Sequence, residues 1–82
     1  MKTIIFTARA AKEFDALPAK ARREVGSSLN DYAMTGRGDV KALKGQGGFR
    51  MRVGSYRILF DEDQVTILAI TITRRSTTTY RR

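Results

Sequence analysis

Arginines recur at alternating positions in two short runs of the chain, residues 49–53 and 56–60, which a Gly-Ser dipeptide separates. Alternation with a period of two is typical of β-strands, and a two-residue break that contains glycine predicts a tight hairpin. In that hairpin Arg52 lies opposite Arg57, Arg50 lies on the same face, and the other face is apolar. Because a guanidinium presents a planar fork of hydrogen-bond donors that suits phosphate oxygens, the arginine face has the chemistry to hold a phosphate.

The pairing of Arg52 with Arg57 has a cost. Like charges directly opposite each other destabilise a sheet by up to about 1 kcal/mol. One interpretation is a solvated basic face on which the long side chains splay apart. The other is an anion bound between them, which we favour because a chain selected for stability alone would place an acid at one of the two positions.

A further strand is expected over residues 65–73, and its register decides what else joins the arginines. A two-residue loop before it would direct Leu68, Ile70 and Ile72 to the arginine face. An odd loop, such as Glu62 to Gln64 with Asp61 opposite Val65, directs them to the apolar face, and burial favours this register. The expected core on that face is Phe49, Met51, Val53, Tyr56, Ile58, Phe60, Leu68, Ile70 and Ile72. The arginine face gains Thr71, Thr73 and Arg75 over a floor of Leu59, Ile67 and Ala69.

The first half of the chain predicts a strand over residues 2–7 and then two helices. Thr7 can cap the first helix, Pro18 suits the start of the second, and Gly36 is a natural stop. Residues 36–48 are expected to form an irregular connector anchored by Val40 and Leu43. The predicted fold class is α+β: an N-terminal strand and a two-helix hairpin packed on a mainly antiparallel four-stranded sheet. We expect a single domain over residues 1–82, of which residues 74–82 form a basic tail.

Composition narrows the classes of partner. The 82 residues include 16 basic and 8 acidic side chains, a net charge of +8, and the excess is concentrated from Lys44 onward. That asymmetry favours a polyanionic partner, with nucleic acid first. No apolar run approaches the roughly 18 residues of a membrane span, and residues 1–6 are too short for a signal peptide. We therefore expect a soluble, cytoplasmic protein with no membrane partner.

The residue types exclude most catalytic machinery. The chain has no His and no Cys, so it lacks a His base, a Ser-His triad and a thiolate nucleophile. The acidic run Asp61-Glu62-Asp63 lies in an expected turn, where a solvated turn is far more common than a metal site, and we expect no metal and no small-molecule cofactor.

Cleavage of RNA through its own 2′-hydroxyl needs no metal, because the enzyme supplies alignment, charge neutralisation and proton transfer. The expected phosphate-aligning residues are Arg50, Arg52, Arg57 and Arg75. Arginine is a poor base. Tyr80 is the best candidate for proton transfer, since neighbouring cations lower the pKa of a phenol, although packing of this aromatic on the sheet edge or on a partner is an equally good interpretation. Lys41 and Lys44 border the same end of the hairpin.

Four segments together resemble a known family: Leu43-Lys44-Gly45, the run FRMRVGSYRILF at residues 49–60, Ile72-Thr73-Arg74-Arg75, and Tyr80. The pattern is similar to the RelE/ParE toxins of bacterial toxin–antitoxin modules, over nearly the whole chain. The resemblance implies a toxin held inactive by a cognate antitoxin. Members of the RelE branch enter the A site of the ribosomal 30S subunit and cut mRNA by 2′-hydroxyl attack, whereas members of the ParE branch inhibit DNA gyrase.

The resemblance also implies roles for single residues. Arg57 matches the arginine that stabilises the transition-state phosphate, Arg75 one that contacts the phosphate or leaving group, and Tyr80 a tyrosine that orients or stacks on the substrate. Arg50 and Arg52 stand where the RelE branch often has lysines, one of them proposed as the general base, which leaves the base of this chain unassigned. Further contacts with RNA are expected from Lys41, Lys44, Arg74, Arg81 and Arg82.

Three functions remain open from the sequence. The leading one is a ribosome-dependent mRNA endonuclease, with ribosome, mRNA and antitoxin as partners, because Arg57, Arg75 and Tyr80 favour the RelE branch. The second is a gyrase inhibitor of ParE type, which the arginines at lysine positions favour. The third is a general nucleic-acid-binding module whose affinity falls steeply with salt.

Overall fold

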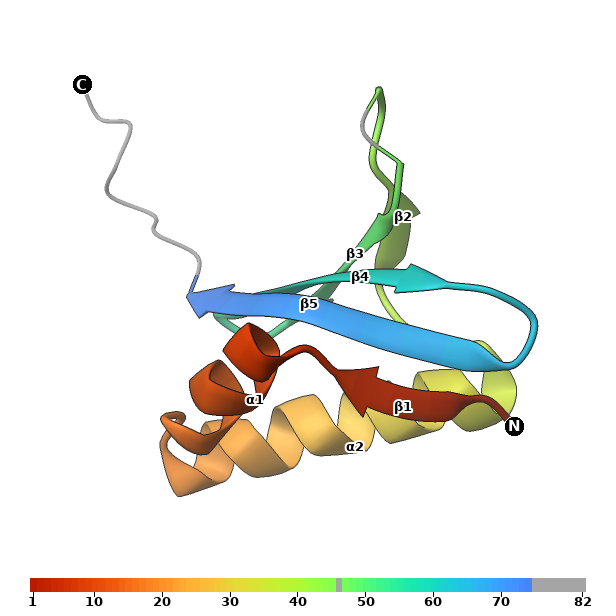
Figure 1. Ribbon diagram of the computed structural model, residues 1–82. Coiled ribbons are helices and arrows are strands. Elements are labelled where there is room, and N and C mark those ends of the chain that lie inside the picture. The colour runs from red at the N-terminus through yellow and green to blue at the C-terminus, as the bar shows by residue number, and fades with distance from the viewer. Residues whose placement is uncertain (46, 75–82) are drawn as a thin grey trace.

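The computed structural model describes residues 1–45 and 47–74. Two helices lie side by side beneath one face of a five-stranded sheet (Figure 1). In chain order the elements are β1 (Thr3–Phe6), α1 (Ala8–Asp15), α2 (Ala19–Thr35), β2 (Val40–Ala42), β3 (Phe49–Val53), β4 (Tyr56–Glu62) and β5 (Thr66–Arg74).

The sheet has the order β1-β5-β4-β3-β2, in which β1 runs parallel to β5 and the other neighbours are antiparallel. The predicted α+β class and mainly antiparallel sheet are confirmed, but the sheet has five strands and not four. The extra strand is β2, which lies in the segment expected to be irregular. Val40, half-buried against the core, pairs with Met51 there, and Lys41 pairs with Arg50.

The ends of the helices lie at or next to residues that favour helix termini. The Thr7 side chain accepts a hydrogen bond from the amide of Ala10, which caps α1. Pro18 stands one residue before α2, as its N-cap. Gly36 ends that helix in the left-handed conformation, with φ of 78°, which a residue without a Cβ adopts readily.

The core lies between the helices and the lower face of the sheet. Its largest fully buried side chains are Phe60, Leu29, Met51, Ile58, Ile67 and Val25. The Phe60 ring stacks on Phe49 and meets Tyr32 edge to face. Burial of such side chains contributes about 1.5–3 kcal/mol each, so this layer supplies most of the stabilisation.

The β3–β4 hairpin has the predicted register, including Arg52 opposite Arg57 across a Gly54-Ser55 turn. The predicted pairing of Asp61 with Val65 is wrong, because Asp61 pairs with Leu68. The register then shifts by one residue at a β-bulge: Phe60 pairs with Ala69, whereas Leu59 pairs with Thr71.

The bulge divides β5 into two halves that face differently. Before it, Ile67 and Ala69 are fully buried on the helix side, while Leu68 is half-buried and Ile70 is 41% exposed. After it, Ile72 is buried as expected. The predicted placement of Leu68 and Ile70 in the core, and of Ile67 and Ala69 under the arginines, is therefore wrong. Apolar residues occur at both parities of this strand, so alternation alone does not fix which set turns inward.

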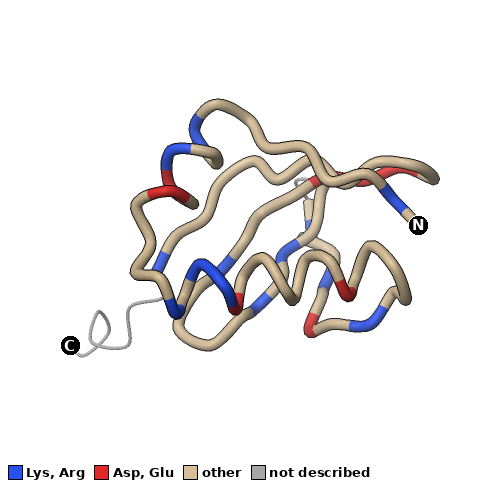
Figure 2. Tube along the Cα trace, turned by 90° about the horizontal axis from the view of Figure 1, so that it is seen from below, with Lys and Arg blue, Asp and Glu red and all other residues tan. Residues whose placement is uncertain are grey.

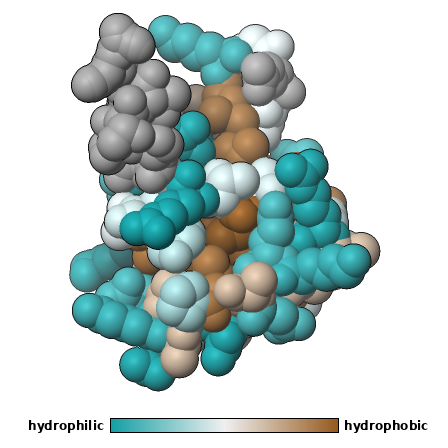
Figure 3. Space-filling model, turned by 90° about the vertical axis from the view of Figure 1, so that its left-hand side faces the viewer, coloured by the Kyte–Doolittle hydropathy of each residue, from teal (hydrophilic) through white to brown (hydrophobic). Residues whose placement is uncertain are grey.

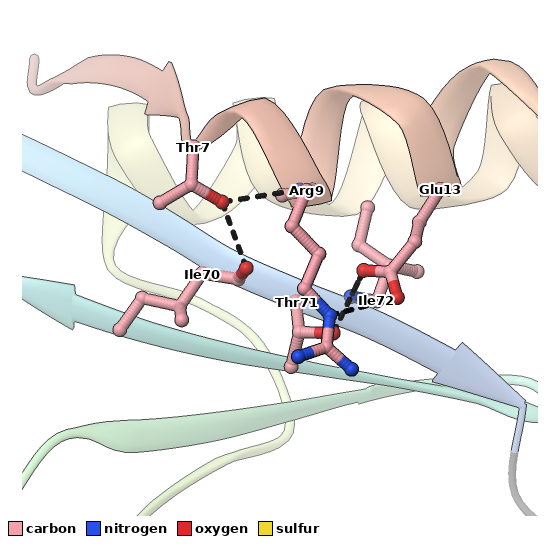
Figure 4. A network of polar contacts seen from close by, with 7 residues as sticks. Thr7, Arg9, Glu13, Ile70, Thr71 and Ile72 are labelled. Atoms are coloured by element: carbon pink, nitrogen blue, oxygen red, sulfur yellow. Dashed lines mark hydrogen bonds and ion pairs between the residues drawn. The ribbon is translucent and has the colours of Figure 1, made fainter.

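Helix α1 takes the place of β1 along the last part of β5, as Figure 4 shows. Strand β1 ends at Phe6, and beyond it the Thr7 hydroxyl donates to the Ile70 carbonyl oxygen at 2.8 Å. The Glu13 carboxylate accepts from the Ile72 amide at 2.8 Å and from the Thr71 hydroxyl at 2.7 Å. These hydrogen bonds lower the pKa of Glu13, and the edge of β5 is satisfied by side chains where no strand covers it.

A second polar cluster lies around Glu62, the last residue of β4. Glu62 accepts from Lys2 Nζ at 2.6 Å and from the Tyr32 hydroxyl at 2.7 Å, so the residue before β1, helix α2 and strand β4 meet at one carboxylate. Burial, and then the neighbouring Glu62, raise the pKa of Tyr32 to about 12. Asp63 accepts from the amides of Val65 and Thr66 and thereby shapes the turn before β5.

Candidate nucleic-acid interface

The upper face of the sheet is covered by neither helix, and we call it the open face (Figure 1). The strand registers show which residues of each strand have side chains on this face and which have side chains on the helix side. Its members near the β3–β4 turn are Lys41, Arg50, Arg52, Arg57, Leu59, Thr71 and Thr73. The three arginines of the hairpin and Thr73 are thus brought together as the sequence predicts, whereas Thr71 is buried and donates its hydroxyl to Glu13 of α1.

Arg52, Arg57 and Thr73 form one row across the sheet, since Arg57 pairs with both of the others. Both arginines are exposed. Among the described residues neither has an acidic side chain within 4.0 Å. Two adjacent guanidiniums without a counter-ion form a site of positive potential, and a phosphate there would neutralise both.

Arg50 occupies a different environment from its two neighbours. Only 14% of its side chain is exposed, and its Nη1 has no hydrogen-bond partner in the described part of the chain. The nearest carboxylate oxygen is Asp39 Oδ1, at 4.0 Å, which is too far for a hydrogen bond. A half-satisfied buried guanidinium is costly, and an anion that reached Nη1 would remove that cost.

Asp39 is a site residue that the sequence analysis missed. Its backbone oxygen accepts from the amide of Arg52 at 3.0 Å, so it continues β2 by one position opposite that arginine. The signal was hidden because residues 36–48 were expected to be irregular. Asp39 can be assigned to the arginine face only when the pairing of β2 with β3 is known.

The other basic residues are distributed more widely. Lys41 is exposed on the open face, and Lys44 is exposed near the tip of the β2–β3 hairpin, which stands away from the body of the molecule (Figure 1). Arg74 is exposed but pairs with Tyr56, which faces the helix side, so its register places it off the open face. Arg75, Tyr80, Arg81 and Arg82 lie outside the described residues.

Charge is distributed differently on the two sides of the sheet. On the helix side basic and acidic residues are interspersed (Figure 2). On the open face the cations gather toward the β3–β4 turn, whereas Asp61 lies beside Leu68 toward the other end. Figure 3 shows, at the end of the molecule that carries α1, a narrow apolar strip between hydrophilic side chains. Of the predicted floor, Leu59 has the register of the open face, whereas Ile67 and Ala69 are buried on the helix side.

No group of three or more Asp or Glu side chains gathers in residues 1–45 and 47–74 to hold a metal ion. None of the described helices is both long enough and apolar enough to cross a bilayer.

The fold matches toxin structures of toxin–antitoxin modules, although no family model and no curated protein sequence matches the chain. The RelBE2 toxin–antitoxin complex from Mycobacterium tuberculosis matches with a TM-score of 0.77 and 25% identity, covering 90% of this chain and 98% of that chain. The isolated RelE toxin from Escherichia coli matches with a TM-score of 0.80 and 17% identity, covering 96% and 89%. A YoeB/ParE toxin from Agrobacterium tumefaciens matches with a TM-score of 0.73 and 15% identity, covering 93% and 100%. This chain therefore has the fold of the RelE-like toxin superfamily.

Proposed function

We propose that this chain is the toxin of a toxin–antitoxin module and an endoribonuclease that cuts mRNA in the ribosomal A site. The observation that carries the proposal is the row of Arg52 and Arg57 on the uncovered face of the sheet, exposed and without an acidic partner in the described residues. The toxin structures that share the fold support the toxin role and a cognate antitoxin as partner.

The chemistry that suits this face is attack of a ribose 2′-hydroxyl on the adjacent phosphorus. Negative charge develops on the non-bridging phosphate oxygens in the transition state, and fixed cations stabilise it more than the ground state. In this proposal Arg57 and Arg52 contact these oxygens, and Arg50 lies two residues before Arg52 on β3. Arg75 and Tyr80 are the further catalytic residues of this proposal, while Lys41, Lys44, Arg74, Arg81 and Arg82 bind RNA or ribosome. No step uses a metal or a cofactor.

The experiment that tests the proposal is primer extension on an mRNA incubated with the protein, with and without translating ribosomes. New 5′ ends within A-site codons, seen only when ribosomes are present, are the expected result. Intact mRNA in both reactions, with a protein that still stops growth, contradicts it. If the protein binds bare RNA with an affinity that falls steeply with salt, but neither cuts mRNA nor stops growth, it is a nucleic-acid-binding module instead.

A second candidate is inhibition of DNA gyrase. It is favoured by Arg50, which stands where RelE-type toxins often have lysine and whose side chain is largely withdrawn from solvent. In this case the arginines form a docking surface and no RNA bond is broken. A gyrase supercoiling assay separates the two candidates, since the nuclease proposal expects unchanged supercoiling.

A further inference from the structure

The proposed cleavage needs a group that removes the proton of the 2′-hydroxyl, and the arginines of the open face are proton donors rather than acceptors. The chain has no His. Tyr80, the candidate for proton transfer that the sequence offers, lies outside the described residues, and among those the strongest candidate acceptors beside this face are carboxylates. This inference rests on the proposed function. The positions of the acidic residues in the described part of the chain limit which of them can act as the base.

We infer that Asp39 is the general base of the open face. It lies opposite Arg52, in the same row that continues through Arg57 to Thr73. Neighbouring strands are about 4.8 Å apart, so Asp39 and Arg57 stand two strand spacings, about 10 Å, from each other at the backbone. Arg52 lies between these two positions, so a phosphate bound by Arg52 and Arg57 has Asp39 as the neighbouring acid of the row.

The Asp39 carboxylate is free to accept a proton. Its side chain is 58% exposed, and in the described residues it makes no hydrogen bond. Its contact with Arg50 Nη1 is 4.0 Å long, which attracts the carboxylate toward the arginines without occupying its lone pairs. Asp39 and Arg52 also border a cavity of about 440 Å³, which residues of α2, among them Asp31, line from the helix side.

The other acids near the site are engaged, distant or on the helix side. Asp31 borders the same cavity as Asp39 but lies on α2, beneath the sheet. Glu13 already accepts from Ile72 and Thr71, and Glu62 from Lys2 and Tyr32. Asp61 is on the open face but lies four residues along β4 from Arg57, about 13 Å away and toward the opposite end of the sheet.

The step that Asp39 performs balances without another reagent. The carboxylate takes the 2′-hydroxyl proton as the 2′-oxygen forms its bond to phosphorus. The bond from phosphorus to the 5′-oxygen breaks, and that oxygen takes a proton from water. The products are a 2′,3′-cyclic phosphate and a 5′-hydroxyl.

The test measures cleavage and binding separately on ribosomes programmed with a defined mRNA. Cleavage is followed with the toxin in excess, so that a single turnover reports the chemical step. Binding is measured on the same complexes with 2′-deoxynucleotides in the A-site codon, which lack the nucleophile. Removal of a general base lowers a rate by roughly 10²–10⁴-fold, so Asp39→Asn is expected to lose at least about 100-fold in rate. Its dissociation constant is expected to change by less than about threefold, as for an exposed surface charge.

Two further variants make the result specific. Asp61→Asn removes the same charge from the same face and is expected to cleave within about threefold of the wild type. Asp39→Glu retains the carboxylate and is expected to cleave faster than Asp39→Asn.

Several outcomes overturn the assignment. Wild-type cleavage by Asp39→Asn does so directly. Equal losses of rate and binding make Asp39 a structural residue, and a selective loss of rate in Lys41→Gln with Asp39→Asn unaffected moves the base to that lysine. A wild-type protein that leaves the mRNA intact on ribosomes overturns the proposed function first, and the role of Asp39 with it.

Discussion

The two faces of the sheet use the same strands for opposite purposes. On the covered face Ile58 and Phe60 are buried against the helices. On the open face the residues between and beside them, Arg57 and Leu59, meet solvent together with Arg52. Alternation lets one hairpin supply stability below and positive charge above, and neither face has to compromise for the other.

The energies of the two faces explain how the charged one is tolerated. Two arginines directly opposite each other cost up to about 1 kcal/mol. Burial of one large side chain such as Phe60 contributes about 1.5–3 kcal/mol on the other side of the same strand pair. Changes on the open face should therefore alter activity at constant stability, and changes on the covered face should alter stability first.

The largest expected effect is on activity, from Arg57→Ala. Loss of one donor that stabilises a developing anion lowers a rate by about 10²–10³-fold, so growth inhibition and mRNA cleavage should both disappear while the thermal unfolding temperature stays near that of the wild type. Growth assays with induced protein and primer extension measure the first part, and thermal unfolding the second.

The matched control is Arg23→Ala, which removes an exposed arginine from α2 on the helix side. It should remain toxic. A folded Arg57→Ala protein that is fully toxic would remove the open face from the mechanism and contradict the division between the faces.

A second pair of variants tests which side chains belong to the covered face. Ile67→Ala should lower the free energy of unfolding by about 2–5 kcal/mol, because Ile67 is fully buried. Ile70→Ala, at the bulge and 41% exposed, should cost less than about 1 kcal/mol. Urea denaturation of both proteins gives the comparison. Equal losses would mean that β5 has a different register in solution.

This strand also shows where sequence reasoning stops. The β3–β4 hairpin could be predicted pair by pair, since its apolar residues fall at one parity and a Gly-Ser turn fixes its register. In β5 both parities are apolar, and the bulge at Ile70 lies where the cover of the strand's far edge changes from β1 to α1. Such a constraint comes from elements about 60 residues away in the chain and leaves no local pattern.

The candidate site also contains residues that could be predicted from the sequence and residues that could not. Arg50, Arg52 and Arg57 were predictable because they belong to one hairpin. Asp39 was not, because β2 has only three residues, too few alternations to be recognised among the five glycines of residues 36–48. The burial of Arg50 was equally hidden, since it depends on side-chain packing at the β2–β3 junction.

A third prediction concerns the seam between the faces, where Glu13 supports β5. Glu13→Ala leaves the Ile72 amide without its acceptor and should cost about 1–3 kcal/mol, measured by urea denaturation at pH 7. The pKa of Glu13 is lowered in the folded protein, so its contribution is present above the ordinary glutamate value of about 4.3 and is lost as pH falls through the folded pKa. The difference between wild type and variant should therefore shrink in acid.

Asp15→Ala serves as its control, because this acid is exposed on the same helix and its side chain makes no hydrogen bond in the described residues. It should be nearly neutral at both pH values. A difference between wild type and Glu13→Ala that is the same at pH 7 and pH 3 would show that packing, and not the carboxylate, matters at this position.

The smallest expected effect comes from Tyr32→Phe, which removes one hydroxyl from the covered face. Its hydrogen bond to Glu62 should be worth about 1 kcal/mol, since Lys2 still holds the carboxylate and the ring keeps its contact with Phe60. The folded pKa of Tyr32, about 12, is above the ordinary value of about 10, so this contribution is present below pH 10 and is lost as the pH rises toward 12. Unfolding of both proteins at pH 8.5 and 11.5 measures it, and because every other group is shared, the difference between the two proteins isolates the hydroxyl. If Tyr32→Phe cleaves mRNA at the wild-type rate while losing this stability, the covered face acts on the open one only by holding the sheet together.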